Sequence, residues 1–171
     1  QQLALSVVQV LVADDSAGFE QIIRSGSGVV VDADAGLIAT SYPVVNLYDA
    51  DGTPAFSSLI IAVSRDAGTE PVREFVAEVA TADPTLDIAI IRITGRVDGE
   101  ALGDLNLPAV ALGDATSASA GFNLRLFGYP GLPSDGSTVA QVLQKSESTI
   151  VGQRGTVARS GRTWFKTDAR M

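Results

Sequence analysis

Residues 26–45 read G-S-G-V-V-V-D-A-D-A-G-L-I-A-T-S-Y-P-V-V, and the pattern of this stretch decides the fold class. Two apolar runs, at residues 28–32 and 37–40, lie on either side of the short segment A-D-A-G at residues 33–36. The glycine of that segment can supply a positive φ angle, which a tight turn between two strands requires. The stretch therefore predicts a β-hairpin.

Further short runs rich in valine, isoleucine and leucine surround this hairpin, with turn-forming residues between them. They lie at residues 3–12, 19–24, 59–64, 74–80 and 88–93. Together with the hairpin they give about seven short strands and no long helical period, which predicts an all-β barrel or sandwich. The run at 88–93 is apolar almost throughout, which predicts a central strand buried on both faces.

A segment rich in glycine and aspartate at residues 96–108 predicts a linker between two lobes. The linker divides the chain into an N-terminal β-barrel lobe at residues 1–95 and a C-terminal lobe at residues 109–171. Strands are expected to resume in the second lobe at residues 109–112, 123–127, 139–143, 148–151, 155–158 and 163–167.

Composition and charge limit the classes of function. The chain has 171 residues, 46% of them hydrophobic, and a mean hydropathy of +0.24, which are the values of a folded protein with a real core. Its net charge of −8 argues against a nucleic-acid partner, which would be repelled. No apolar run approaches the roughly 18 residues of a membrane span, so we expect no transmembrane segment.

The charge is unevenly distributed along the chain. Residues 1–140 carry 18 acidic and 6 basic side chains, whereas residues 141–171 carry 2 acidic and 6 basic ones. The basic surplus near the end is either a solvated face or a contact surface for an acidic partner. The sequence begins with Gln1 rather than methionine, which suggests processing, by removal of a signal peptide or otherwise.

The opening stretch resembles one family of peptidases. Trypsin-like serine peptidases of the HtrA/Deg type read G-S-G-x-x-hydrophobic-D-x-x-G-hydrophobic-I-hydrophobic-T-N-x-H-V-V in this place. Aligned on Thr40, Val44 and Val45, the histidine of the family falls on Pro43, and the chain contains no histidine.

Later segments are similar to the same family, in the same order. Residues 82–93, A-D-P-T-L-D-I-A-I-I-R-I, resemble D-P-x-x-D-L-A-V-L-K-I, in which the second aspartate is the acid of the catalytic triad; it maps onto Asp87. The resemblance implies a fold of two β-barrels, each a six-stranded Greek key. The other similar segments are L-G-D at 112–114, F-G-Y-P-G at 127–131, residues 151–158 and F-K-T-D-A at 165–169.

The family resemblance also implies where the nucleophile lies. In the family the nucleophilic serine is part of G-x-S-G-G-P, a few residues after T-D-A, whereas this sequence ends at Met171. We therefore expect the nucleophile and the last strands to lie beyond the sequence, so that the second barrel is incomplete in this chain. A protein partner or a cleaved C-terminal segment is expected to complete it, because bare strand edges and an open apolar interior are unfavourable.

The chemistry of the candidate site depends on Pro43 and Asp87. The triad needs a base that takes the proton of the serine and a carboxylate that orients this base, and proline has no titratable group. Asp87 is then either a relic triad acid or a carboxylate that begins a strand, and both can hold together. The leading hypothesis is a catalytically inactive domain, a pseudoprotease, that acts as a protein-binding, scaffolding or regulatory module.

Two alternative functions stay open from the sequence. The chain is an N-terminal fragment of an active serine endopeptidase, or it is a structural subunit of a larger assembly. A serine–lysine dyad is disfavoured because Lys145 and Ser146 are neighbours, and neighbours on a strand point to opposite faces. The family and the N-terminus suggest an extracellular, periplasmic or cell-envelope location.

No cofactor or metal is expected. The G-S-G at residues 26–28 opens a strand rather than a helix, so it lacks the helix N-terminus that binds phosphate. Asp32 and Asp34 match the start of a calcium loop, but Gly36 replaces the third ligand and Pro43 stands where the twelfth-position glutamate belongs. The chain contains no cysteine, which excludes disulfides and cysteine-based metal sites.

Overall fold

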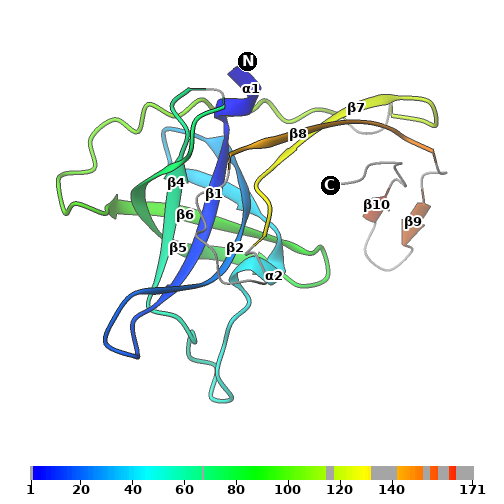
Figure 1. Ribbon diagram of the computed structural model, residues 1–171. Coiled ribbons are helices and arrows are strands. Elements are labelled where there is room, and N and C mark those ends of the chain that lie inside the picture. The colour runs from blue at the N-terminus through cyan, green and yellow to red at the C-terminus, as the bar shows by residue number, and fades with distance from the viewer. Residues whose placement is uncertain are drawn as a thin grey trace.

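A computed structural model describes residues 2–66, 68–114, 118–131, 142–151, 155–157 and 162–164, and Figure 1 shows its elements. In chain order they are α1 (Gln2–Leu5), β1 (Val7–Asp14), β2 (Gln21–Asp32), β3 (Leu37–Thr40), α2 (Tyr42–Val45), β4 (Ser58–Val63), β5 (Val72–Asp83), β6 (Ile88–Arg96), β7 (Asn123–Gly128), β8 (Gln144–Thr149), β9 (Gly155–Val157) and β10 (Arg162–Trp164). The all-β fold class predicted from the sequence is confirmed.

The first six strands form a closed barrel in the order β1-β2-β3-β6-β5-β4. All pairs are antiparallel, and β1 closes the barrel by pairing with β4 on its other side. Strands β1, β2 and β3 thus form one group of consecutive antiparallel strands, and β4, β5 and β6 form a second. The two groups are joined by the pairs β3–β6 and β1–β4. A six-stranded Greek-key barrel is what the family resemblance implied for the first lobe.

Alternate residues of the strands fill the interior of the barrel. In β1, Val8, Val10 and Val12 point inward and are fully buried. Residues outside the strands complete this core, among them Val44 of α2 and Leu105. The other strands contribute Val30, Ile38, Leu59, Ile61, Val63, Phe75, Ala89, Ile91 and Ile93.

The structure corrects the beginning of the chain. The strand predicted at residues 3–12 starts only at Val7, because residues 2–5 form the short helix α1. The strands predicted at 19–24 and 28–32 are one continuous strand, β2. Gly26, between the two predicted runs, and Gly28, at the start of the second, do not interrupt it, because β1 pairs along its length and places Val10 opposite Gly26 and Val8 opposite Gly28.

The prediction that residues 88–93 are buried on both faces is wrong. Burial alternates along β6, with Ala89, Ile91 and Ile93 inside and Ile88 and Arg92 exposed. A barrel strand has one face toward the shared core and one toward the outside, so even an apolar run is only half buried there.

Residues 97–114 form no strand but are held against the barrel. Leu105 and Leu107 are buried in the barrel core, and the guanidinium group of Arg65 donates to the carbonyl of Asn106 at 2.8 Å. The strand predicted at 109–112 is absent, because with the described residues this segment makes one backbone bond, from Val110 N–H to the carbonyl of Val30 at 2.9 Å. The lobe boundaries at 1–95, 96–108 and 109–171 stay predictions.

The later part of the chain contains two antiparallel ribbons, β7–β8 and β9–β10. The strand predicted at 123–127 is β7, and those predicted at 155–158 and 163–167 overlap β9 and β10. The strand expected at 148–151 starts earlier than predicted, because β8 spans Gln144–Thr149. Of the strand expected at 139–143, residues 139–141 lie outside the described residues. Within the described parts of the chain, no helix is long and apolar enough to cross a membrane.

Candidate functional site

The G-S-G motif positions the short helix α2 against β2. Glycine at position 26 leaves room for the side chain of Val44, since a Cβ atom there would lie 2.4 Å from Val44 Cγ2. Gly28 likewise leaves room for the side chain of Ile38 on the paired strand β3, since a Cβ atom at position 28 would lie 2.6 Å from Ile38 Cγ2. The two glycines face the barrel interior, and α2 can therefore pack its valines into the core directly after β3.

The side chain of Arg24 binds backbone carbonyl groups of α2 and of the residue that follows it. Its guanidinium group donates to the carbonyl of Pro43 and, at 3.4 Å, to the carbonyl of Asn46. Charge-assisted bonds of this kind are about twice as strong as neutral ones and satisfy carbonyls that a short helix leaves without partners. Arg24 thereby fixes the backbone at Pro43, the position that the family resemblance assigns to the catalytic histidine.

Asp87 lies at the end of the turn between β5 and β6. The Asp83 side chain accepts from the backbone N–H of Thr85 at 2.7 Å and of Leu86 at 3.0 Å, which shapes this turn. Asp87 comes next with φ = 56°, a left-handed conformation that aspartate tolerates better than most residues. Its carbonyl accepts a hydrogen bond from Tyr42 N–H at 3.4 Å, so the turn touches the start of α2, which lies beside it in Figure 1.

The structure thus brings the two predicted site positions onto neighbouring segments. Pro43 directly follows Tyr42, whose N–H bonds to Asp87. Both Pro43 and Asp87 are exposed, and among the described residues the Asp87 carboxylate has no hydrogen bond or ion pair. In a working triad the corresponding acid is buried and bonded to the imidazole. At these two positions the structure therefore places an exposed carboxylate beside a proline, which has no titratable side chain.

No group of metal-binding side chains occurs in the described parts of the chain. Asp32 belongs to the hairpin turn, where its side chain accepts from the N–H of Ala35 at 2.9 Å, as a turn aspartate does.

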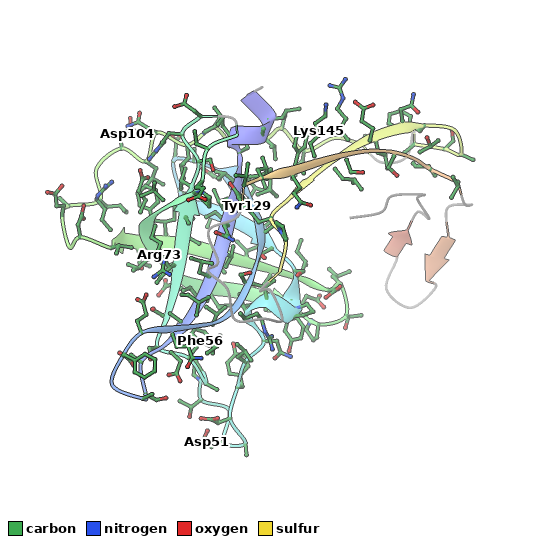
Figure 2. All side chains as sticks on the ribbon, in the orientation of Figure 1. Asp51, Phe56, Arg73, Asp104, Tyr129 and Lys145 are labelled. Atoms are coloured by element: carbon green, nitrogen blue, oxygen red, sulfur yellow. The ribbon has the colours of Figure 1, made fainter. Side chains whose placement is uncertain are left out.

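Tyr129 is a structural residue whose role the sequence motifs do not reveal. Its backbone N–H donates to Ser27 Oγ on β2 at 2.8 Å, and its hydroxyl lies 3.0 Å from Ser64 Oγ, just after β4. Ser64 Oγ donates its one hydrogen to the carbonyl of Thr69 at 3.0 Å, so Tyr129 is the donor of the pair. Since β1 lies between β2 and β4, Tyr129 crosses over β1 and fastens the end of β7 to the barrel (Figure 2).

The sequence signal for Tyr129 is the F-G-Y-P-G turn at 127–131, which indicates a turn but not its contacts. The tyrosine is 5% exposed, and burial raises the pKa of its hydroxyl, with the bond to Ser64 acting in the opposite direction. Ser27, the middle residue of G-S-G, is therefore a contact to the second part of the chain, while the glycines on either side of it serve the core.

A groove of about 500 Å³ lies between the barrel and β7. Ser27, Val29 and Ala39 line it from the barrel, Val110 from the connecting segment, and Phe127 from β7. It is largely apolar and lies next to the Ser27–Tyr129 contact.

Comparison with known proteins gives the family. The model of the trypsin-like peptidase domain family matches residues 26–171, which is most of the chain and includes the G-S-G strand, α2, Asp87 and Tyr129. None of the curated proteins matches the sequence. The match covers well over half of the chain, and the closed six-stranded barrel agrees with it. The chain therefore belongs to the trypsin-like peptidase domain family.

Proposed function

We propose that this domain binds a protein partner without hydrolysing peptide bonds, as a pseudoprotease with a scaffolding or regulatory role. The observation that carries the proposal is Pro43: it comes directly after the residue bonded to Asp87, where the family resemblance of residues 26–45 implies the proton-accepting histidine. The sequence has no histidine that could act from another position.

The chemical argument concerns the proton. Attack by a serine on a peptide carbonyl requires a base that takes the hydroxyl proton and returns it to the leaving amine. Arg24 cannot serve as this base, because a guanidinium group has only N–H donors and no acceptor, and here it donates to the carbonyls of Pro43 and Asn46. An oxyanion hole alone leaves about 10³–10⁴-fold catalysis over water when the triad is broken, far below the activity of a peptidase.

The first prediction tests this proposal on the full-length native protein. Incubation with a fluorophosphonate probe and with casein is expected to give no covalent label and no peptide release above the uncatalysed background. The physical reason is the missing base next to Asp87. The control variant is Asp34→Ala, because Asp34 is also exposed but lies in the turn before β3, away from α2. Casein turnover that is abolished by Asp87→Ala but retained by Asp34→Ala would show an active endopeptidase instead.

We further propose that a protein partner or a cleaved C-terminal segment completes the second barrel. The support is the ribbon β7–β8, which in the described part of the chain pairs only with itself. Two-stranded ribbons are marginally stable alone, and three or more strands with an apolar face are needed for independent stability. On one side of the ribbon the half-buried Leu124 and Leu126 of β7 lie opposite Ser148 and Ser146 of β8, so β7 alone contributes large apolar side chains there.

The second prediction concerns this ribbon. In the 171-residue chain alone, amide hydrogens of β7 and β8 are expected to exchange at least about 100-fold faster than those of the closed barrel, because a two-stranded ribbon opens at a lower free-energy cost than the barrel does. In the protein purified from its source they are expected to be protected. A monodisperse 171-residue monomer in which both strands resist exchange as well as β1 would contradict the proposal.

The kinship to HtrA/Deg-type peptidases and a location outside the cytoplasm are also proposals. Both are supported by the resemblance of residues 26–45 and 82–93. The location can be tested by adding a protease to intact and to ruptured source cells. Cleavage of the protein only after the envelope is ruptured would argue against an extracellular location.

A further inference from the structure

The groove between the barrel and β7 meets the edge of that strand rather than one of its faces. From the β7–β8 ribbon it is lined by Arg125, Leu126 and Phe127, three consecutive residues of β7. Successive side chains of a strand point to opposite faces, so a groove that touches three residues in a row runs along the backbone edge.

This edge of β7 offers backbone N–H and C=O groups. Ile150 N–H donates to the carbonyl of Phe122 at 3.0 Å, which fixes the residues through which the two strands bond. Hydrogen-bonded and non-hydrogen-bonded pairs alternate in an antiparallel ribbon, so Leu126 bonds to β8, whereas Arg125 and Phe127 direct their backbone groups away from β8. Within the described residues no strand pairs with this edge of β7. Unused backbone groups in a row are a template for a further strand.

The barrel cannot supply that strand, because each of its six strands is already paired on both sides. What it supplies is an apolar wall. Val7, Val29 and Ala39 line the groove and are cross-strand neighbours on β1, β2 and β3, since Val29 lies opposite both of the others. The added strand would therefore lie between the edge of β7 and aliphatic side chains of the barrel.

The charge of the lining decides which side chains the added strand carries. Among the described residues that line the groove, Arg125 is the charged one, and its acid is already present: the carboxylate of Glu147 lies 3.8 Å from its guanidinium nitrogen. A further charged side chain would lose water in the groove without gaining a partner, which is costly. The lining thus fits uncharged, aliphatic residues.

We propose that an extended segment of a partner protein, with uncharged aliphatic residues at alternate positions, binds in this groove as a strand added to β7. Its backbone bonds to Arg125 and Phe127, and its aliphatic side chains lie against the barrel wall. This inference rests on the proposed completion of the second barrel and names the place and the chemistry of the completing segment. A second copy of the chain fits less well, because the strands β7 and β8 that it could offer carry charged side chains.

The test is an NMR titration of the ¹⁵N-labelled 171-residue chain with the blocked hexapeptide V-T-V-T-V-T. The peptide is expected to shift the amide signals of Arg125, Phe127 and Val29 with a Kd of about 1 mM or lower. Two derivatives test the pairing, one methylated at the valine nitrogens and one at the threonine nitrogens. Only one of them is expected to lose affinity, by at least about tenfold, because alternate N–H groups of a strand point to the same edge.

Two proline variants test the edge of the protein. Arg125→Pro removes an N–H that β8 does not use, so the ribbon tolerates it, and it is expected to weaken binding at least about fivefold. The matched control is Lys145→Pro, which removes an N–H from the opposite edge of the same ribbon, since Lys145 lies across from Phe127. It is expected to leave the Kd unchanged. If Arg125→Pro disrupts the ribbon, the methylated peptides decide the question.

Each other outcome overturns the inference. It is wrong if the hexapeptide produces no shifts in β7, if the two methylated derivatives bind equally, or if Lys145→Pro weakens binding as much as Arg125→Pro. Shifts in β7 on concentrating the chain without peptide would assign the edge to a second copy. A native protein that carries only a cleaved segment of its own chain on β7 would likewise replace the partner protein.

The proposed completion of the second barrel fails separately. If β7 and β8 are protected from amide exchange in the native protein, that proposal stands even when the hexapeptide does not bind, and the completing segment lies elsewhere on the ribbon. If the ribbon of the native protein exchanges as fast as that of the 171-residue chain, the completion itself is refuted.

Discussion

Phe75→Ala is expected to lower the free energy of unfolding of the barrel by about 3–5 kcal/mol, a large fraction of the stability of a domain of this size. Phe75 lies on β5, is fully buried, and packs in the aliphatic core that the six barrel strands share. The guanidinium group of Arg96 lies 5.4 Å from the centre of its ring, and this contact would be lost as well.

Urea denaturation followed by circular dichroism measures this change. The matched control is Phe19→Ala, because Phe19 is 64% exposed in the loop between β1 and β2 and its truncation is expected to change stability by less than about 0.5 kcal/mol. If the two variants unfolded at the same urea concentration, the position of Phe75 in the core would be wrong.

Tyr129→Ala is expected to release the β7–β8 ribbon while the barrel stays folded. The side chain is 5% exposed and reaches Ser64, and its truncation costs about 3 kcal/mol, as for other buried aromatic residues. Amide exchange in β7 and β8 should accelerate about 100-fold, and exchange in β1 to β6 should change little. Acceleration spread evenly over all strands would contradict this separation.

Tyr129→Phe keeps the ring and removes only the hydroxyl bond to Ser64, at a cost of about 1 kcal/mol. It also tests the titration of Tyr129. Burial raises the pKa of the hydroxyl above its ordinary value of 10.0, so the folded state prefers the protonated form. The stability it contributes is complete below pH 10 and is lost as the pH rises through the higher pKa of the folded state. This alkaline loss should be smaller in Tyr129→Phe.

Much of the first barrel could be predicted from the sequence because its signals are local. The turn at residues 33–36 and the apolar runs on both sides indicate the β2–β3 hairpin, and similar runs indicate β4, β5 and β6. The single strand β2 could not be seen, because Gly26 separates the two predicted runs and Gly28 opens the second of them. Glycine is required at these two positions because a side chain there would collide with Val44 or Ile38, and these residues lie on other elements of the fold.

The candidate site was predicted as two separate positions, Pro43 and Asp87, through family motifs. That Tyr42 joins their segments by a hydrogen bond is a property of the folded chain. The glycines around Leu105 and Leu107 predict a linker there, although the barrel core extends to both leucines. The contact between Ser27 and Tyr129 spans 102 residues, and no local pattern predicts a bond of this range.

The pairing of β1 with β4 has a consequence for how this protein behaves at high concentration. A sheet closed on itself offers no row of unused backbone N–H and C=O groups along its sides, so another molecule cannot add a strand to it. Within the described residues, self-association by strand addition would then have to begin at the β7–β8 or the β9–β10 ribbon rather than in the barrel.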